Sequence, residues 1–292
     1  MPELQTLTFG LMPSFDGLPS LVAVRQGIYD SLDIKIDFIT YASATDRDAA
    51  FLSGKLDGML TDYPGATLLQ AKGSRLRLVM ETDGSLSLIA SKQSNVRNPD
   101  GLKGKNISVS GNTFVEYATD EVMKRACLHP GEVNKPEINN IPLRLMMLED
   151  GQISASFLPG PATAIALNDG HTALLNTRQM GLHCTGIVFS EKAITEKDEE
   201  IRRFITGYNL GVKYLQTHPQ NEWTEILVKE FGLQEKAAMQ IDLPDYRPAT
   251  RPSYHDIEKI IAWLKSKGAI PDYYPGENLV DTTFIPGTLK PQ

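Results

Sequence analysis

The feature that most constrains this chain is an alternation of strand-like and helix-like segments that occurs twice. In the first set, apolar runs at 7–12, 34–39 and 58–61 alternate with helical segments at 19–26, at 43–54 and from 64 onward. Pro19 and Gly27 fit a helix with proline in its first turn and glycine just after its end. Strands that alternate with helices predict an α/β fold, in which a largely parallel sheet carries helices on its faces.

The second set repeats this order, with apolar runs at 105–110, 137–141 and 153–157 and helical segments at 113–127, at 143–150 and after Pro159. One stretch of the two sets can be aligned. LSGKLDGMLTDYP (52–64) and EDGQISASFLPGP (149–161) both run glycine, polar, apolar, polar, small, and reach proline ten residues after the glycine. The offset between them is 97 residues. The repeat predicts two similar Rossmann-like lobes.

The chain is predicted to leave the first lobe, build the second and return. Strand-like runs at 86–90 and 185–189 lie at the two junctions and would serve as hinge strands. We therefore assign residues 1–88 and 188–292 to lobe 1 and residues 89–187 to lobe 2, with a ligand cleft between them. Helices are expected at 195–217 (capped by Thr195), 221–231, 234–241 and 254–267 (capped by Ser253), and this helical C-terminal region is expected to pack on lobe 1.

Composition narrows the classes of partner. Hydrophobic residues make up 41% of the chain and charged residues 22%, which is ordinary for a globular protein. The net charge is −7 and there is no block of Lys or Arg, which argues against nucleic acid or an anionic membrane surface as a partner. No apolar run is long enough to span a membrane. The first residues, MPELQTLTF, lack the basic and apolar regions of an export signal.

The sequence gives no indication of catalysis. The motifs GxSxG, GxxxxGKS/T and GxGxxG are absent. The five histidines do not have the spacing of metal ligands: His129, His171, His183, His218 and His255. Cys127 and Cys184 are too few for a metal cage or a disulfide framework. We therefore predict that the chain is not an enzyme and holds no metal or cofactor.

The loops that follow the strands offer candidate ligand-binding residues, because ligands of α/β lobes bind at the carboxyl ends of the strands. These loops contain small hydroxyl residues, carboxylates and aromatic residues, with no Lys or Arg in the set. The candidates are Ser14, Phe15, Asp16, Asp62, Tyr63, Asp83 and Ser85 in the first lobe, and Asn112, Thr113, Phe114, Glu116, Pro159 and Gly160 in the second. Such a set suits a small polar or amine-bearing ligand held partly by stacking.

Each candidate also has a structural interpretation. Thr113 and Glu116 form a capping box, so Glu116 would bond to its own helix. Asp16 and Asp62 precede helices and would serve as N-caps. The rings of Phe15 and Phe114 would fill the core. Tyr63 is the candidate least explained by capping or packing.

Five stretches of the chain carry a resemblance to a known family: LPSLVAVRQGIY (18–29), FLSGKLDGMLTDYPGATLLQAKG (51–73), NPDGLKGKNISVSGNTFVEYATDEVMKRACL (98–128), GQISASFLPGPATAIAL (151–167) and GIVFSEKAI (186–194). In these stretches the chain resembles the solute-binding proteins of bacterial ABC importers. It is similar to the group that includes taurine-, alkanesulfonate- and nitrate-binding proteins and thiamine-precursor-binding proteins. The resemblance implies a periplasmic-binding-protein fold of the second type and a monomer that hands its ligand to the transmembrane subunits of an ABC permease. It also implies export, as a periplasmic protein or a lipoprotein, and we attribute the missing signal to its removal.

Carried over by position, the resemblance implies that the ligand touches the candidates above and also Thr185 on the returning strand. A sulfonate would bind the helix N-terminus at Thr113, and an amine would bind Asp16, Asp62 or Glu116. Because the candidate residues include no Lys or Arg, they favour an aminosulfonate or an amine-bearing heterocycle, such as a thiamine-precursor pyrimidine, as the ligand. The alternative is an enzyme on the same fold, either a pyrimidine-precursor synthase, whose cysteine-rich motif is missing here, or a menaquinone-pathway enzyme. A cytosolic sensor is a third interpretation, but the sequence offers no helix-turn-helix or signalling module.

Overall fold

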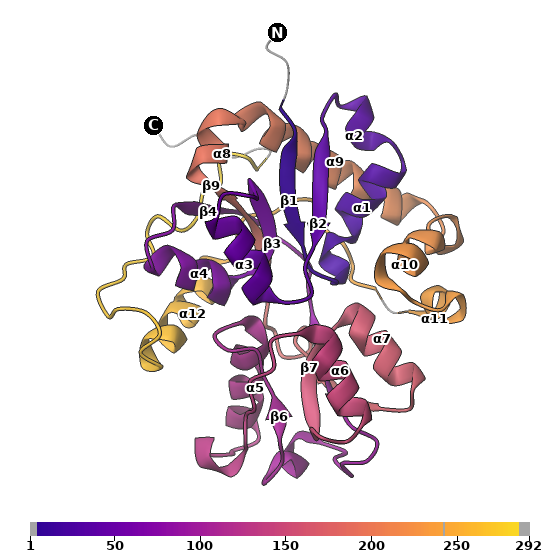
Figure 1. Ribbon diagram of the computed structural model, residues 1–292, viewed down its shortest axis with the longest axis vertical. Helices are drawn as coiled ribbons and strands as arrows, with labels where there is room; N and C mark the ends of the chain where they lie inside the picture. The colour runs from indigo at the N-terminus through magenta and orange to yellow at the C-terminus, as the bar shows by residue number, and fades with distance from the viewer. Residues whose placement is uncertain (1–4, 242, 286–292) are drawn as a thin grey trace.

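The computed structural model describes residues 5–241 and 243–285 and consists of two lobes, one below the other in Figure 1. Among these residues the first lobe has a five-stranded sheet of order β2-β1-β3-β9-β4, and the second a four-stranded sheet of order β6-β7-β5-β8. The first sheet comprises β1 (Leu7–Leu11), β2 (Ile36–Thr40), β3 (Gly58–Asp62), β4 (Leu76–Glu81) and β9 (Thr185–Ser190). The second comprises β5 (Leu86–Ala90), β6 (Ile107–Ser108), β7 (Ala155–Pro159) and β8 (Thr172–Asn176).

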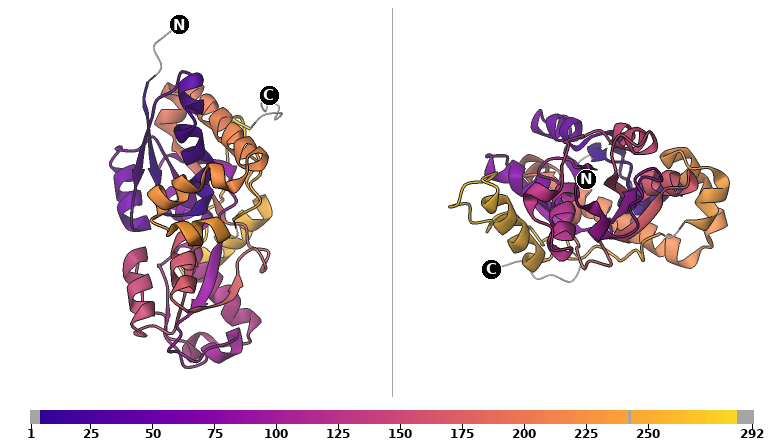
Figure 2. Two further views of the ribbon diagram at one scale, coloured as in Figure 1. Left: turned by 90° about the vertical axis from the view of Figure 1, so that its right-hand side faces the viewer. Right: turned by 90° about the horizontal axis from the view of Figure 1, so that it is seen from below.

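Helices cover both lobes (Figures 1 and 2). The first lobe carries α1 (Leu18–Arg25), α2 (Ile28–Ser31), α3 (Ala44–Leu52) and α4 (Tyr63–Ala71), and the second α5 (Phe114–Arg125), α6 (Ile141–Glu149) and α7 (Gly160–Asn168). The C-terminal region forms α8 (Glu191–Glu196), α9 (Asp198–Thr217), α10 (Thr224–Phe231), α11 (Glu235–Gln240) and α12 (Tyr254–Ser266). Among the described residues, none of the helices combines the length and the apolar character of a membrane span.

The internal repeat is confirmed. Shifting α3, β3 and α4 by 97 residues gives the bounds of α6, β7 and α7. The helix ends also correspond, because Gly54 and Gly151 follow α3 and α6 with φ of 77° and 70°, where a side chain would be strained. The segments α3-β3-α4 and α6-β7-α7 are therefore two copies of one arrangement, one in each lobe.

Three local predictions are wrong. Residues 137–141 form no strand, because one isolated bridge, Val109 with Glu137, joins them to the edge of the second sheet, and Ile141 already begins α6. Thr195 does not cap a helix, since it lies inside α8 and donates to the Glu191 carbonyl, while Ser190 caps α8. The sheets are mixed, because β9 is antiparallel to β3 and β4, as β5 is to β7 and β8.

Each sheet buries apolar side chains on both faces. Met59 and Leu60 are neighbours on β3, yet they belong to separate buried clusters because successive side chains of a strand point to opposite faces. One cluster lies under α1 and α9, where the Phe9 and Phe204 rings stack with centroids 4.8 Å apart. The other contains Tyr63, Ile260 and Leu264 from α4 and α12. The C-terminal helices thus pack on the first lobe, as predicted.

Helix α12 also contacts the second lobe, which the sequence did not predict. The indole Nε1 of Trp263 donates to Asp120 Oδ2 on α5 at 3.0 Å, and the Trp263 ring packs edge-on against Tyr117. Lys267, just after α12, forms an ion pair with Glu116. Figure 1 shows α12 beside α4 at the boundary between the lobes. The helix therefore links the lobes in addition to the two chain crossings, at 82–85 and 177–184.

The predicted division at residues 88 and 188 remains a prediction. In terms of sheets, β5 belongs to the second lobe and β9 to the first, so each strand follows a crossing rather than forming it. Residues 1–4, 242 and 286–292 of the predicted lobe 1 lie outside the described residues.

Candidate functional site

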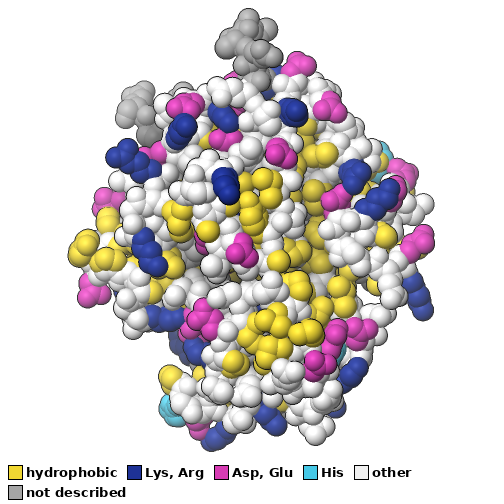
Figure 3. All heavy atoms as spheres, in the orientation of Figure 1, with side chains coloured by type: hydrophobic (Ala, Val, Ile, Leu, Met, Phe, Trp, Pro, Cys, Tyr) yellow, Lys and Arg dark blue, Asp and Glu magenta, His cyan; other side chains and the backbone are white. Residues whose placement is uncertain are grey.

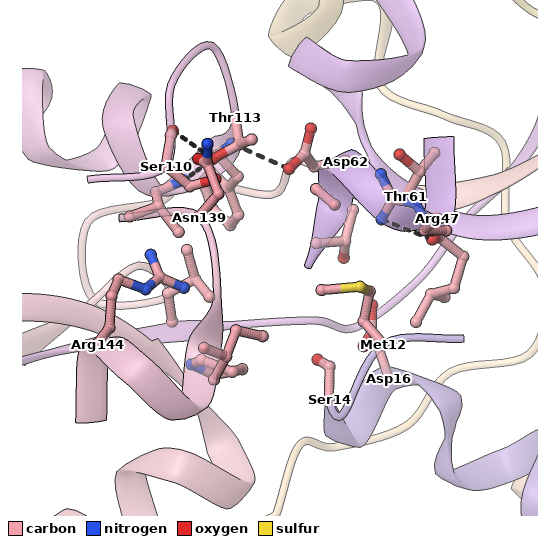
Figure 4. A pocket seen from close by; sticks show the side chains of 18 residues that line it. Met12, Ser14, Asp16, Arg47, Thr61, Asp62, Ser110, Thr113, Asn139 and Arg144 are labelled. Atoms are coloured by element: carbon pink, nitrogen blue, oxygen red, sulfur yellow. Dashed lines mark hydrogen bonds between the residues drawn. The ribbon is translucent and has the colours of Figure 1, made fainter. Parts of the chain in front are cut away.

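A cavity lies between the two lobes at the carboxyl ends of their strands (Figure 4). Its walls combine polar side chains with apolar ones, and both lobes contribute. The lining residues are Met12, Ser14, Asp16, Ala44, Arg47, Leu60, Thr61, Asp62 and Thr185 on elements of the first lobe, and Leu86, Ser110, Thr113, Phe114, Val115, Asn139, Ile141, Arg144 and Pro159 on elements of the second. This is the place at which α/β folds bind ligands.

The cavity brings together half of the residues predicted to bind ligand. Those that line it are Ser14, Asp16, Asp62, Thr113, Phe114, Pro159 and Thr185. Those that do not line it are Phe15, Tyr63, Asp83, Ser85, Asn112, Glu116 and Gly160. Contact with a ligand remains a prediction for every one of them.

Asp16 is a buried carboxylate that does not cap a helix. It lies within a short 3-10 turn (Phe15–Gly17), and no side chain caps α1. Its Oδ2 accepts from Thr82 Oγ1 at 3.1 Å, whereas its Oδ1 has no hydrogen-bond partner among the described residues. Burial raises the pKa of Asp16, the Ser14 and Thr82 hydroxyls lower it, and Asp83 raises it further. The structural interpretation of Asp16 as a cap is therefore wrong.

Asp62 does act as an N-cap, and it also connects the lobes. Its Oδ1 accepts from Gly65 N at 2.7 Å at the start of α4. Its Oδ2 accepts from Phe114 N at 3.0 Å, which is the first backbone N–H of α5 in the second lobe. The helix N-terminus predicted to bind a sulfonate thus carries a carboxylate of the other lobe in this conformation.

Further contacts join the lobes beside Asp62. The Ile141 N–H donates to the Ala42 carbonyl at 3.1 Å, and Ser43 and Asn140 form an isolated antiparallel bridge. Ser43 and Asn140 are the N-caps of α3 and α6. The structure therefore shows the lobes in contact across the cleft.

Four residues outside the cavity have structural partners instead. Tyr63 is fully buried, and its hydroxyl donates to Glu81 Oε2 at 2.9 Å. Glu116 accepts from Asn112 N at 2.8 Å and forms ion pairs with Lys135 and Lys267, so it does bond at the start of its own helix. The predicted capping box is not formed, because Thr113 accepts from Val115 N and donates its own N–H to the Ser110 carbonyl. Asp83 forms an ion pair with Arg247 at 2.6 Å.

Phe15 and Gly160 pack against each other away from the ligand space. The Phe15 ring lies so close to Gly160 that a Cβ there would be 2.0 Å from Cδ2 of the ring. The other side of Phe15 meets Phe231 edge-on, with ring centroids 5.2 Å apart. The core interpretation of Phe15 is confirmed, whereas Phe114, also buried, lines the cavity as well.

The expectation of a site without cations is wrong, because Arg47 and Arg144 line the cavity. Each is the fourth residue of its helix, α3 or α6, and their side chains extend from the helices rather than from the loops that follow strands. An inspection of those loops could not find them. The repeat could have found them, since Arg47 and Arg144 are 97 residues apart.

The outer surface is mixed in character. Acidic and basic side chains are interspersed on the face shown in Figure 3, without a continuous basic area on that face. Hydrophobic side chains gather over the second lobe near α6, on which Leu143 and Met146 are 41% and 50% exposed. This pattern agrees with the absence of Lys and Arg blocks in the sequence.

Known proteins share this architecture. The ligand-binding component of an ABC-type import system from Staphylococcus aureus is 14% identical, with 96% of this chain and 97% of that chain covered and a TM-score of 0.81. The alkanesulfonate-binding protein of Xanthomonas axonopodis pv. citri is 18% identical, with 93% and 96% covered and a TM-score of 0.77. A desulfurization enzyme has the fold too, at 12% identity, 96% and 97% coverage and a TM-score of 0.68. The predicted periplasmic-binding-protein fold is confirmed.

Sequence comparison gives the family. A Haemophilus influenzae protein that bears the name of a thiamine biosynthesis protein is 21% identical over 266 residues, which are 86% of this chain and 83% of the relative. The sequence model of the NMT1/THI5-like family matches residues 14–222. Because this match extends over most of the 292 residues, the chain belongs to the NMT1/THI5-like family.

Proposed function

We propose that this chain is an extracytoplasmic solute-binding receptor of an ABC importer that encloses a small polar organic ligand between its lobes. One observation carries the proposal. Buried polar atoms from both lobes face the same cavity without hydrogen-bond partners among the described residues: Asp16 Oδ1 and Thr61 Oγ1 from the first lobe, and Arg144 Nε and Nη1 from the second. Burying such atoms unpaired is unfavourable, so a ligand that pairs with both sets would stabilise the closed arrangement.

The similar proteins support this proposal. A component of an ABC-type import system and an alkanesulfonate-binding protein share the fold over more than nine tenths of the chain. The ligand would be an aminosulfonate or an amine-bearing heterocycle such as a thiamine-precursor pyrimidine. The protein would act as a monomer outside the cytoplasm, free in the periplasm or anchored by lipid, and pass its ligand to the permease subunits.

Lobe closure would be the working motion. The crossings at 82–85 and 177–184 would bend, and the bonds from Asp62 to Phe114 and from Ile141 to Ala42 would form on closing and break on opening. The first crossing is tied to the cleft, because Thr82 Oγ1 bonds both Asp16 and Thr185. Ligand at Asp16 would thereby act directly on a hinge segment.

The test is to identify what the purified protein carries. Protein denatured with acid should release one small polar organic molecule in about one-to-one ratio, measured by mass spectrometry. That molecule should rebind to refolded protein, compact it in small-angle X-ray scattering, and be recovered unchanged. Recovery of a chemically altered molecule would support an enzyme on this fold and contradict the receptor.

The pH dependence of stability offers a check on Asp16 that requires no ligand. Its pKa is raised by burial, so the charged form is disfavoured in the folded state. The contribution of Asp16 to stability is then fully present below the pKa that this group has in the unfolded chain, and it is lost as the pH rises through its folded pKa. Asp62 acts in the same direction, since burial raises its pKa as well. Carboxylates with a lowered pKa, such as Glu116, act in the opposite direction, so the comparison is between proteins. In urea denaturation, the stability of Asp16→Asn relative to wild type should rise as pH increases through the folded pKa of Asp16, and the variant should be more stable at neutral pH.

The control for Asp16 is Asp37→Asn, which changes an exposed aspartate of β2. It should reproduce the wild-type curve. If Asp16→Asn also reproduces that curve, its carboxylate is not the buried group described here.

A further inference from the structure

The repeat places two arginines at equivalent positions of the cleft. Arg47 and Arg144 are 97 residues apart, and so are the caps of their helices, Ser43 and Asn140. Both arginines are almost fully buried, with 3% and 2% of their surfaces exposed. The lobes thus present the same side chain to the cavity from opposite sides.

The two arginines differ in their partners. Arg47 donates from Nε and Nη2 to Asp48 Oδ1, at 2.9 and 2.6 Å, and from Nη1 to the Leu60 carbonyl at 3.0 Å. The residue of the second lobe equivalent to Asp48 is Leu145, which offers no carboxylate. Within the described part of the chain, Arg144 Nε and Nη1 therefore have no hydrogen-bond partner.

Arg144 nevertheless remains charged. Burial lowers its pKa to about 10, and no carboxylate contributes to that shift. A guanidinium with this pKa is protonated at neutral pH. The cavity therefore contains a buried positive charge that no acidic side chain of the described residues compensates, and the usual partner of such a group is a carboxylate, sulfonate or phosphate.

Across the cavity from Arg144, the side chain of Asp16 is a carboxylate with an unpaired oxygen. This carboxylate is 3% exposed, and its Oδ1 is the oxygen left without a partner among residues 5–241 and 243–285. Figure 4 shows Asp16 and Arg144 on opposite sides of the cavity, with the Arg144 guanidinium directed from α6 into it. Apolar residues, among them Met12 and Ile141, also line the space.

We infer that the ligand carries both charges: an anionic oxyacid group held by Arg144 and a protonated amine or amidine-like group held by Asp16. This inference rests on the proposed receptor function and narrows its ligand class. An aminosulfonate meets the requirement. An amine-bearing heterocycle meets it only when it also bears a carboxylate, sulfonate or phosphate, so a neutral aminopyrimidine alcohol is excluded.

Matched probes test the inference by calorimetric titration of the ligand-free protein. The first set shares one skeleton: taurine with both charges, ethanesulfonate with the anion, and ethylamine with the cation. The second set is 4-amino-5-hydroxymethyl-2-methylpyrimidine and its phosphate ester. We expect the doubly functional member of at least one set to bind about 100-fold more tightly than its single-function partners, because each buried charge otherwise stays unpaired.

Variants show which side chains cause the tighter binding of the doubly functional probes. Arg144→Gln should remove the advantage of the acidic group, a loss of about 100-fold, while Arg144→Lys should restore part of it by keeping the charge. Asp16→Asn should remove the advantage of the amine. The control is Lys124→Gln, which removes an exposed charge from α5 of the same lobe and should bind as wild type does. Circular dichroism shows which variants are folded, and the wild-type comparison of probes needs no variant.

Three results would overturn the inference. One is that matched probes with and without the acidic group bind with equal affinity and that Arg144→Gln does not change this. That result would show that Arg144 does not hold an anion, and it would not contradict the receptor proposal. Failure of every probe to bind folded wild-type protein at about 1 mM would also reject it, since paired buried charges should exceed that affinity. The receptor proposal is judged separately by the released molecule, and a molecule without an acidic group would reject this inference alone.

Discussion

Replacing Arg47 with methionine should lower the free energy of unfolding by about 2 kcal/mol, whereas the same change at Arg144 should leave the ligand-free protein as stable as before or more stable. Arg47→Met removes a buried guanidinium, so the Leu60 carbonyl and the Asp48 carboxylate, whose side chain is 22% exposed, lose the donor that pairs with them. Arg144→Met removes a buried charge that has no acidic partner among the described residues. Two equivalent arginines should therefore respond in opposite directions.

Urea denaturation of ligand-free protein, with the slope of the transition compared between variants, measures both effects. Ligand must first be removed, because a bound ligand would add its own stabilisation to the wild type. Equal losses in the two variants would mean that Arg144 has a partner in the free protein. Equal stability of all three proteins would mean that the Arg47–Asp48 pair contributes nothing.

Gly211→Ala should destabilise the protein by about 3 kcal/mol or more, through the contact between α9 and α1. A Cβ at Gly211 would lie 2.1 Å from the carbonyl oxygen of Pro19 and 2.9 Å from its carbon. Both are backbone atoms of α1 and cannot move aside as a flexible side chain would. Helix propensity favours alanine over glycine by about 1 kcal/mol, so the sign of the measured change shows which effect dominates.

Thermal and urea denaturation of Gly211→Ala can be compared with Gly131→Ala as a matched control. A Cβ at Gly131 would meet no atom within 4 Å. The control should differ from wild type by less than about 1 kcal/mol. A Gly211→Ala protein more stable than wild type would show that α9 does not approach α1 as closely as described.

The parts of the fold that depend on local chemistry could be predicted from the sequence. Ser43, Thr113 and Ser253 cap helices by accepting from Asp46 N, Val115 N and Asp256 N, and all three caps were evident from the residues nearby. The repeat of 97 residues gave the two lobes. Strands β4 and β8 were missed, because each is an edge strand whose place depends on a single partner from a distant part of the chain.

The site was predicted less completely, because its partners are distant in sequence. Tyr63 bonds Glu81 across 18 residues, and the Lys267 that holds Glu116 comes from beyond α12. No local pattern distinguishes such partners from a ligand. The two arginines escape prediction for another reason: they lie on α3 and α6 and not in the loops that follow strands, so their position in the local pattern does not distinguish them from other helical arginines. Applying the offset to Arg47 and Asp48 leads directly to Arg144 and Leu145.

The return of the chain to the first lobe through β9 sets an order of assembly during synthesis. In the described chain, β4 joins its sheet only through β9, so the first sheet lacks a strand between β3 and β4 until residues 185–190 leave the ribosome. All four strands of the second sheet, from Leu86 to Asn176, have emerged by then. The lobe begun second is therefore complete first. Through that interval the edges of β3 and β4 are exposed, and they are where a chaperone or a neighbouring nascent chain would bind.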